Sequence, residues 1–232
     1  MTTDKSAGLA VLFRPHAAKR LSIVDAAANV FCREGYGGAN IDLIAAEAGV
    51  SRQTVYNHHG DKENLFKAVV GDITERTNAG FFATLATFPD HPRDLEADLT
   101  AFAFRLSSNC VCSRDGKFLR RLIQNEGERY PELFAGWRED GPGKTWAALA
   151  ARFARLALAG HLDIDDPDLA ARQFLALVNA DLHVTSMLGE TPDEQQLQRS
   201  AANAVRTFLR AYRRRPEPVV TAFSRDKSAT DA

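Results

Sequence analysis

Apolar residues recur every three or four positions along most of this chain, which is typical of α-helices packed against a core. One such face runs from His16 to Glu34, and Gly35 then stops the helix. Further stripes follow with the same period, and none of them alternates every second residue as a strand would. They span residues 61–85, 95–109, 117–126, 131–139, 144–159, 167–187 and 192–213. The pattern predicts an all-α fold.

Capping residues and prolines set the expected boundaries. Asp166-Pro167 and Thr191-Pro192 each pair a capping residue with proline at the first helical position, so helices are expected to begin at both prolines. Residues 1–15 and 216–232 carry no sustained period, and we expect a flexible arm and a flexible tail there.

Two short helices separated by a tight turn are predicted between Ile41 and Leu65. The first is apolar on one face and ends at Gly49, which adopts a left-handed conformation at little cost. Ser51 can cap the second helix through its hydroxyl. In that second helix only Val55 is plainly apolar, so its other side chains are free to hydrogen-bond to a partner. A helix-turn-helix that reads DNA has this division of labour.

Composition places the chain among globular proteins. Its 232 residues are 45% hydrophobic, which is enough for one large or two modest domains with a proper core. No apolar run approaches the roughly 18 residues of a membrane span, and no signal peptide precedes the first helix. The three cysteines are an odd count and form no disulfide framework. We therefore expect a cytoplasmic protein with no membrane partner.

The charge balance limits how the chain could bind DNA. The formal net charge is -1, and residues 1–70 hold eight basic and seven acidic side chains. Proteins that coat nucleic acid without reading sequence need a much denser basic surface. Affinity should instead come from a few placed contacts that are doubled by dimerisation.

Residues 26–66 read AAANVFCREGYGGANIDLIAAEAGVSRQTVYNHHGDKENLF, and this run resembles the DNA-binding domain of TetR/AcrR transcriptional regulators. The segments FLRRLIQNEGERYPEL and DDPDLAARQFLALV are similar to the AefR-like C-terminal subgroup. The resemblance implies an N-terminal three-helix domain over residues 16–62. A long helix from residue 62 would join it to a ligand-binding and dimerisation domain over residues 63–215.

Carried over position by position, the resemblance implies that one set of side chains reads bases and another faces phosphates. Arginine can form two hydrogen bonds to guanine, and glutamine or asparagine can do the same to adenine. The base-reading set is Arg52, Gln53, Thr54, Tyr56 and Asn57, and the phosphate-facing set is Asn40, His58 and Lys62. Lys62 stands in a first helical turn, which disfavours a cation unless a phosphate faces it.

His59 departs from the family pattern, which usually has an aromatic or apolar residue after the histidine. We expect a half-buried ring whose N–H has a partner, in preference to a pH sensor.

The resemblance further implies a homodimer on a palindromic operator, most often a repressor. We expect the subunits to pair through residues 167–187 and 192–212, whose apolar stripes would form a four-helix interface. A small ligand in the C-terminal domain could tilt the long helix and release the operator. A ligand-independent regulator and a nonspecific architectural protein are the alternatives.

The ligand pocket is the least defined part of the prediction. Aromatic residues between about 100 and 155 could line an apolar cavity with a few polar anchors, but core packing is the stronger explanation for most of them. The candidate residues are Phe102, Arg105, Leu106, Asn109, Phe118, Leu122, Trp137 and Trp146, with Gln124 as a further anchor.

Other chemistry is weakly supported. The acidic run Asp163–Asp168 lacks the glycine and the distal glutamate of a calcium loop, so helix capping explains it better. No cysteine and histidine set has zinc spacing, and Cys110 and Cys112 suit idle thiols better than a redox sensor. No catalytic motif is present, and we expect neither enzymatic activity nor a cofactor.

Overall fold

The computed structural model describes the backbone of residues 6–214 and the side chains of residues 18–180, 182 and 184–214. Within that part of the chain, helices alternate with turns, and the extended pairing is limited to an isolated bridge between Leu162 and Arg213. The all-α prediction is confirmed. The α-helices are α1 (Ser6–Gly38), α2 (Ile41–Ala48), α3 (Arg52–His59), α4 (Lys62–Leu85), α5 (Leu95–Cys112), α6 (Arg114–Glu126), α7 (Ala135–Arg138), α8 (Lys144–Leu158), α9 (Pro167–Met187) and α10 (Glu194–Tyr212).

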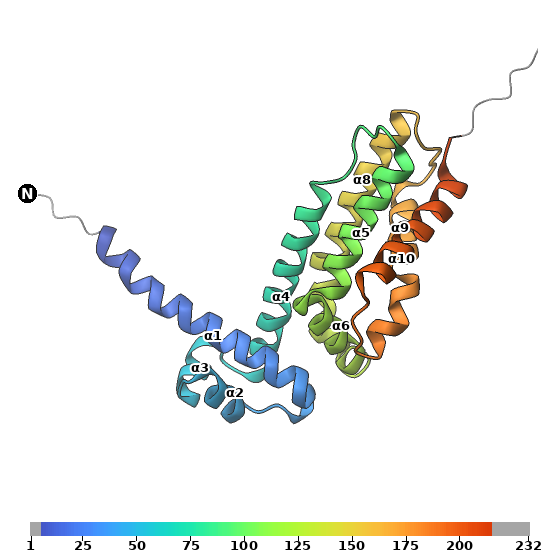
Figure 1. Cartoon of the computed structure of the whole chain (residues 1–232). Helices are drawn as coiled ribbons and strands as arrows, with labels where there is room; N and C mark the ends of the chain where they lie inside the picture. The colour runs from blue at the N-terminus through green and yellow to red at the C-terminus, as the bar shows by residue number, and fades with distance from the viewer. Residues whose placement is uncertain (1–5, 215–232) are drawn as a thin grey trace, which may run out of the picture.

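The helices form two groups joined by α4. Helices α1, α2 and α3 gather at one end of the molecule, and α5, α8, α9 and α10 run side by side in a bundle at the other (Figure 1). The beginning of α1 projects away from the bundle. Helix α1 starts at Ser6, so residues 6–15, which we expected in a flexible arm, are helical. Alanine and leucine favour a helix there even without an apolar face. The expected tail lies outside the described residues.

Side-chain caps set the boundaries of the helix-turn-helix, and the cap predicted at Ser51 is among them. Asn40 and Ser51 each accept a hydrogen bond from the amide three residues later, at 2.9 and 3.1 Å. Gly49 ends α2 with φ 65° and ψ 33°, the left-handed conformation we predicted. Asp61 caps α4 in the same way as the two earlier caps, at 2.7 Å.

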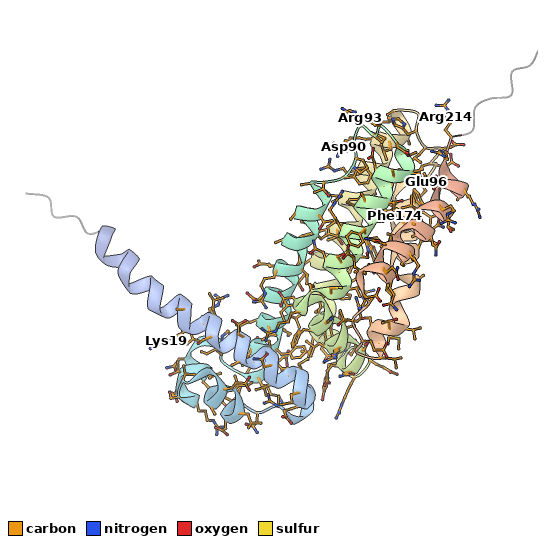
Figure 2. All side chains as sticks on the ribbon, in the orientation of Figure 1. Lys19, Asp90, Arg93, Glu96, Phe174 and Arg214 are labelled. Carbon is orange, nitrogen blue, oxygen red and sulfur yellow. The ribbon has the colours of Figure 1, made fainter. Side chains whose placement is uncertain are left out.

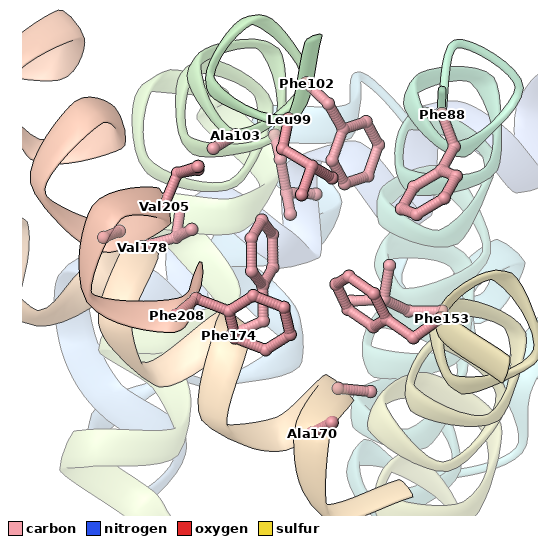
Figure 3. Packing of buried hydrophobic residues seen from close by; sticks show 14 of the residues in the cluster. Phe88, Leu99, Phe102, Ala103, Phe153, Ala170, Phe174, Val178, Val205 and Phe208 are labelled. Carbon is pink, nitrogen blue, oxygen red and sulfur yellow. The ribbon is translucent and has the colours of Figure 1, made fainter. Parts of the chain in front are cut away.

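A phenylalanine cluster fills the bundle. Phe102, Phe153, Phe174 and Phe208 are each at most 1% exposed, and their ring centroids lie 4.9 to 6.2 Å apart where they touch. Figure 3 shows these rings meeting between the helices, and Figure 2 places Phe174 inside the bundle. Burying one such side chain stabilises the fold by about 1.5–3 kcal/mol, so this cluster fixes the bundle.

The apolar stripes of α9 and α10 belong to that core, and our expectation that they face a second subunit was wrong. Helix α10 packs on α5 and α9, and α9 packs on α8, so both stripes are covered within one subunit. The stripes are Phe174, Leu175, Leu177, Val178, Leu182, Leu197, Ala201, Val205, Phe208 and Leu209; only Leu175 and Leu177 are partly exposed. A subunit contact through α9 must use its opposite face.

Two predicted starts in the C-terminal half had different outcomes. Asp166 caps α9 through the amide of Leu169 at 2.9 Å, as predicted. Helix α10 instead begins after Asp193, because Asp193 and Gln196 exchange hydrogen bonds of 2.7 and 2.9 Å in a capping box. The hydroxyl of Thr191, our expected cap, accepts a hydrogen bond from Lys117.

The segment after α6 is less regular than the single helix we predicted over residues 131–139. A 3₁₀ turn (Pro131–Phe134), the short α7 and a π turn (Glu139–Gly143) follow one another. Pro142 lies inside the π turn, where its missing N–H prevents a regular α-helical hydrogen bond.

A second core joins the helix-turn-helix to the C-terminal half. Buried side chains of α1 to α4 pack with Leu119 and Leu122 of α6 and with Phe134. The rings of Phe66 and Phe134 meet edge to face, with centroids 5.7 Å apart. The N-terminal helices are therefore packed directly against α6.

Candidate DNA-binding surface and ligand cavity

Helix α3 packs on the core through one apolar residue and exposes a polar face. Val55 is 1% exposed and is the one buried residue of α3, whereas Arg52, Gln53 and Asn57 are exposed. Thr54 and Tyr56 are half-buried at the edges of this face. The structure thus presents the five residues predicted to read bases on one short helix, and their contacts with DNA stay a prediction.

The exposed side chains of α3 pair with one another at helical spacing. Gln53 donates to Asn57 at 2.9 Å, and Arg52 donates to the Tyr56 hydroxyl at 3.3 Å. Arg52 also lies 3.3 Å from the carboxylate of Asp42 on α2. Both partners of that ion pair are exposed, so it contributes little to stability and can be exchanged for a base or a phosphate.

Lys62 has partners that its sequence position did not reveal. Its ammonium donates to the backbone oxygens of Tyr36 and Ala39 at 2.9 and 3.1 Å and lies 4.6 Å from the centroid of the Tyr36 ring. We expected a phosphate contact because a cation is unfavourable in a first helical turn. These backbone oxygens and the aromatic ring already stabilise the ammonium, so a phosphate is not needed to explain the position of Lys62.

Glu126 holds the same turn from the other side. It is 6% exposed, and its carboxylate accepts a hydrogen bond of 2.7 Å from the Tyr36 amide. Gly35 precedes this amide with φ 70°, and a Cβ there would lie 2.6 Å from the Glu126 carboxylate. Gly35 breaks the helical path near the end of α1, and the turn that follows it at Tyr36 is held by α4 on one side and by the end of α6 on the other. Sequence reasoning missed Glu126 because nothing local marks a carboxylate as the partner of an amide 90 residues away.

His59 is half-buried, as expected, but its Nε2 is buried and has no hydrogen-bond partner among the described residues. The expected partner is therefore absent at Nε2 within the described part of the chain. Burial, with help from the nearby His58 and Arg20, lowers the pKa of His59, so the folded protein holds it neutral. His58 is half-buried beside it, with ring centroids 6.3 Å apart.

A cavity of about 500 Å³ lies in the C-terminal half. Helices α4, α5, α6, α8 and α9 contribute to its wall, together with the segment around the π turn. Its aromatic side chains are Phe81, Trp137 and Trp146, and its polar side chains include Arg76, Asn109, Arg120, Gln124 and Asn179.

The cavity contains only part of the predicted pocket. Asn109, Trp137 and Trp146 line it, as does Gln124. Phe102 and Leu106 are fully buried in the phenylalanine core, and Leu122 is buried in the second core. Arg105 and Phe118 lie elsewhere, and Arg105 donates to Thr87. Helical periodicity shows that a residue points inward. It does not show whether that residue packs in a core or lines a cavity, so the sequence could not separate the two groups.

Three other expectations concern ions, thiols and membranes. Among the described residues no group of histidine, cysteine, aspartate or glutamate side chains could hold a metal ion. Burial raises the pKa of the Cys110 thiol to about 11, which leaves it neutral and a poor nucleophile. No helix in the part of the chain that the structure describes is long and apolar enough to cross a membrane.

Comparisons with known proteins give one consistent result. Residues 23–69 match the model for bacterial regulatory proteins of the tetR family, and residues 97–214 match the C-terminal domain of AefR-like transcriptional repressors. A crystal structure of a TetR-family regulator from Mesorhizobium loti superposes with a TM-score of 0.75 at 30% identity, over 85% of this chain and 98% of that one.

Two curated relatives differ in the sign of their regulation. The chain is 34% identical over 121 residues to the HTH-type transcriptional activator FasR of Mycolicibacterium smegmatis, and the match spans about half of that protein, 52%. It is 29% identical over 179 residues to the HTH-type transcriptional repressor Rv1474c of Mycobacterium tuberculosis, over 76% of this chain and 86% of the repressor.

Proposed function

Because this chain belongs to the TetR family of DNA-binding transcriptional regulators, we propose that it is a dimeric repressor that leaves a palindromic operator when a small molecule fills the cavity. The proposal rests on α3, which is anchored by one buried valine and exposes side chains that can form hydrogen bonds. We place the protein in the cytoplasm, where bacterial DNA is found.

The base-reading role falls to Arg52, Gln53 and Asn57, with Thr54 and Tyr56 at the edge of the helix. Each good two-bond contact to a base is worth about 1–3 kcal/mol of discrimination. Asn40 and His58 are proposed to face phosphates. For Lys62 we favour the structural role, because its ammonium already has two backbone acceptors.

The outer face of α9 is the proposed subunit contact. Leu169, Val184 and Met187 are 41%, 63% and 57% exposed, and Ala176 and Ala180 are exposed between them. These positions follow a helical period and leave an apolar stripe uncovered within the subunit. A two-fold contact through this stripe would present two copies of α3 to the two halves of a palindrome.

Ligand binding would reach the DNA-binding end through α4 and α6. Both helices contribute to the cavity wall, and both then contact the turn at Tyr36, α4 through Lys62 and α6 through Glu126. A ligand that separates these helices would move that turn and shift α3 away from its DNA register.

Selection of bound sequences from random DNA, using the full purified chain, tests this function. We expect enrichment of a two-fold symmetric site with half-sites about one DNA turn apart. Failure to enrich any sequence, with binding that depends only on salt, would support the architectural alternative. Placing the selected site in a reporter then gives the sign of regulation: lower expression supports a repressor, and higher expression would make the chain an activator like FasR.

A further inference from the structure

The charged side chains of the cavity are not all neutralised. Arg76 pairs with Asp115 at 2.9 Å and with Asp72 at 2.8 Å. Arg120 also lines the cavity, but it donates to the Ser186 hydroxyl and to the backbone oxygen of Cys110, both neutral acceptors. It has no carboxylate partner among the described side chains.

The guanidinium of Arg120 therefore has capacity for an anion. Of its five N–H donors, two are used by Ser186 and Cys110. The adjacent Cys110 thiol does not balance the charge, because burial raises its pKa to about 11 and keeps it protonated. An arginine held at two points in a partly buried wall suits the two oxygens of a carboxylate.

Asn179 supplies a second unsatisfied group in the same cavity. Its Nδ2 donates to the Leu175 backbone oxygen at 2.7 Å. Its Oδ1 is buried and has no hydrogen-bond partner among the residues described. A buried oxygen of this kind is unfavourable until an O–H or N–H donor reaches it.

The helix geometry places the two polar groups along the same side of α9. Asn179 and Ser186, whose hydroxyl accepts from Arg120, are seven residues apart in α9, so their backbone positions lie on one face about 10 Å apart along the helix axis. Trp137 and Trp146 border the same space, whose volume of about 500 Å³ suits a molecule with one or two rings.

Building on the ligand-responsive function proposed above, we propose that the cavity binds a hydroxylated aromatic carboxylate. Its carboxylate pairs with Arg120, its hydroxyl donates to Asn179 Oδ1, and its ring system packs against Trp137 and Trp146. A neutral apolar molecule of the same size satisfies neither polar group, and a flexible fatty acid satisfies only the first.

Isothermal titration of the full chain with three rigid probes tests this assignment. The probes are 4′-hydroxybiphenyl-4-carboxylic acid, its methyl ester, and biphenyl-4-carboxylic acid, which lacks the hydroxyl. We expect the hydroxy acid to bind about tenfold or more tightly than either analogue, since each lacks one polar contact. Equal affinities for all three, or no binding of the hydroxy acid, would overturn the proposal.

Two variants connect the preference to the named side chains. Arg120→Gln should remove the preference for acid over ester, whereas Arg121→Gln, on the next residue and outside this cavity, should keep it. Asn179→Leu should remove the preference for the hydroxyl and leave the preference for the acid. Retention of both preferences in both variants would contradict the assignment even where overall affinity changes through altered packing.

Operator binding, measured without any probe, separates this inference from the proposed function. If the chain binds its selected operator but not the hydroxy acid, the ligand class is wrong and the regulator stands. If it binds the hydroxy acid and remains on the operator, the ligand class stands and release by ligand is wrong.

Discussion

Replacing Glu126 with alanine should loosen the helix-turn-helix from the C-terminal half of the protein. The carboxylate is 6% exposed and accepts a hydrogen bond of 2.7 Å from the Tyr36 amide. Alanine would leave that partly buried amide without its carboxylate acceptor. Loss of a hydrogen bond to a charged group costs about 1.5–3 kcal/mol, and we take about 2 kcal/mol.

Hydrogen exchange at the Tyr36 amide measures this cost directly. A loss of about 2 kcal/mol corresponds to roughly 30-fold faster exchange if the turn opens locally. Thermal unfolding should shift down by about 4–8 °C for a chain of this size. Glu126→Gln keeps an oxygen acceptor, so its unfolding temperature should fall by less than half of that shift.

Glu128→Ala is the matched control, because Glu128 lies two residues further on and is exposed. It should change neither the exchange rate nor the unfolding temperature. If Glu126→Ala behaved like Glu128→Ala in both measurements, the turn would not be held by α6, and the proposed route from the cavity to α3 would fail.

Four further predictions follow from individual side chains. Arg52→Ala should relax the preference at one base pair of each half-site in a repeated DNA selection, at a cost of about 1–3 kcal/mol, and an unchanged preference would remove Arg52 from the reading set. Lys62→Met should lower the unfolding temperature and leave the salt dependence of DNA binding unchanged. If the plot of log affinity against log salt concentration became shallower by about one, Lys62 would contact a phosphate after all. His59→Phe should reduce the stability lost on acidification. The pKa of His59 is lowered in the folded state, so the unfolded chain takes up its proton at a higher pH than the folded chain does, and the free energy of unfolding of the wild type falls as the pH drops below the unfolded pKa. The variant should lose less free energy of unfolding between pH 7 and pH 5 in urea titrations, and an equal loss in the two proteins would refute this. Val184→Glu should give a monomer in sedimentation experiments, and an unchanged dimer would exclude the outer face of α9 as the contact.

The sequence predicted features that depend on neighbouring residues. Gly49, Ser51 and Asp166 set helix ends through contacts within one turn, and the structure has all three as expected. The predicted start of α10 was two residues too early, because Thr191 and Asp193 could both cap the helix and the capping box forms at Asp193.

The features that escaped prediction depend on contacts between distant segments. Phe102 and Trp146 look alike in sequence, yet one is fully buried in the core and the other borders the cavity. Lys62 and Glu126 meet the same turn from helices far apart in the chain, and no local pattern shows this. The stripe on α9 was assigned to the wrong partner, since periodicity shows that a face is buried without showing what covers it.

If α3 reads base sequence, the protein must bind its operator far more tightly than other DNA of the same length. The full chain should be titrated against its selected operator and against a scrambled duplex of equal length and composition, at the same near-physiological salt concentration. We predict that the operator binds at least about 10³-fold more tightly. Equal affinities for the two duplexes, falling together as salt is raised, would show that α3 does not read base sequence.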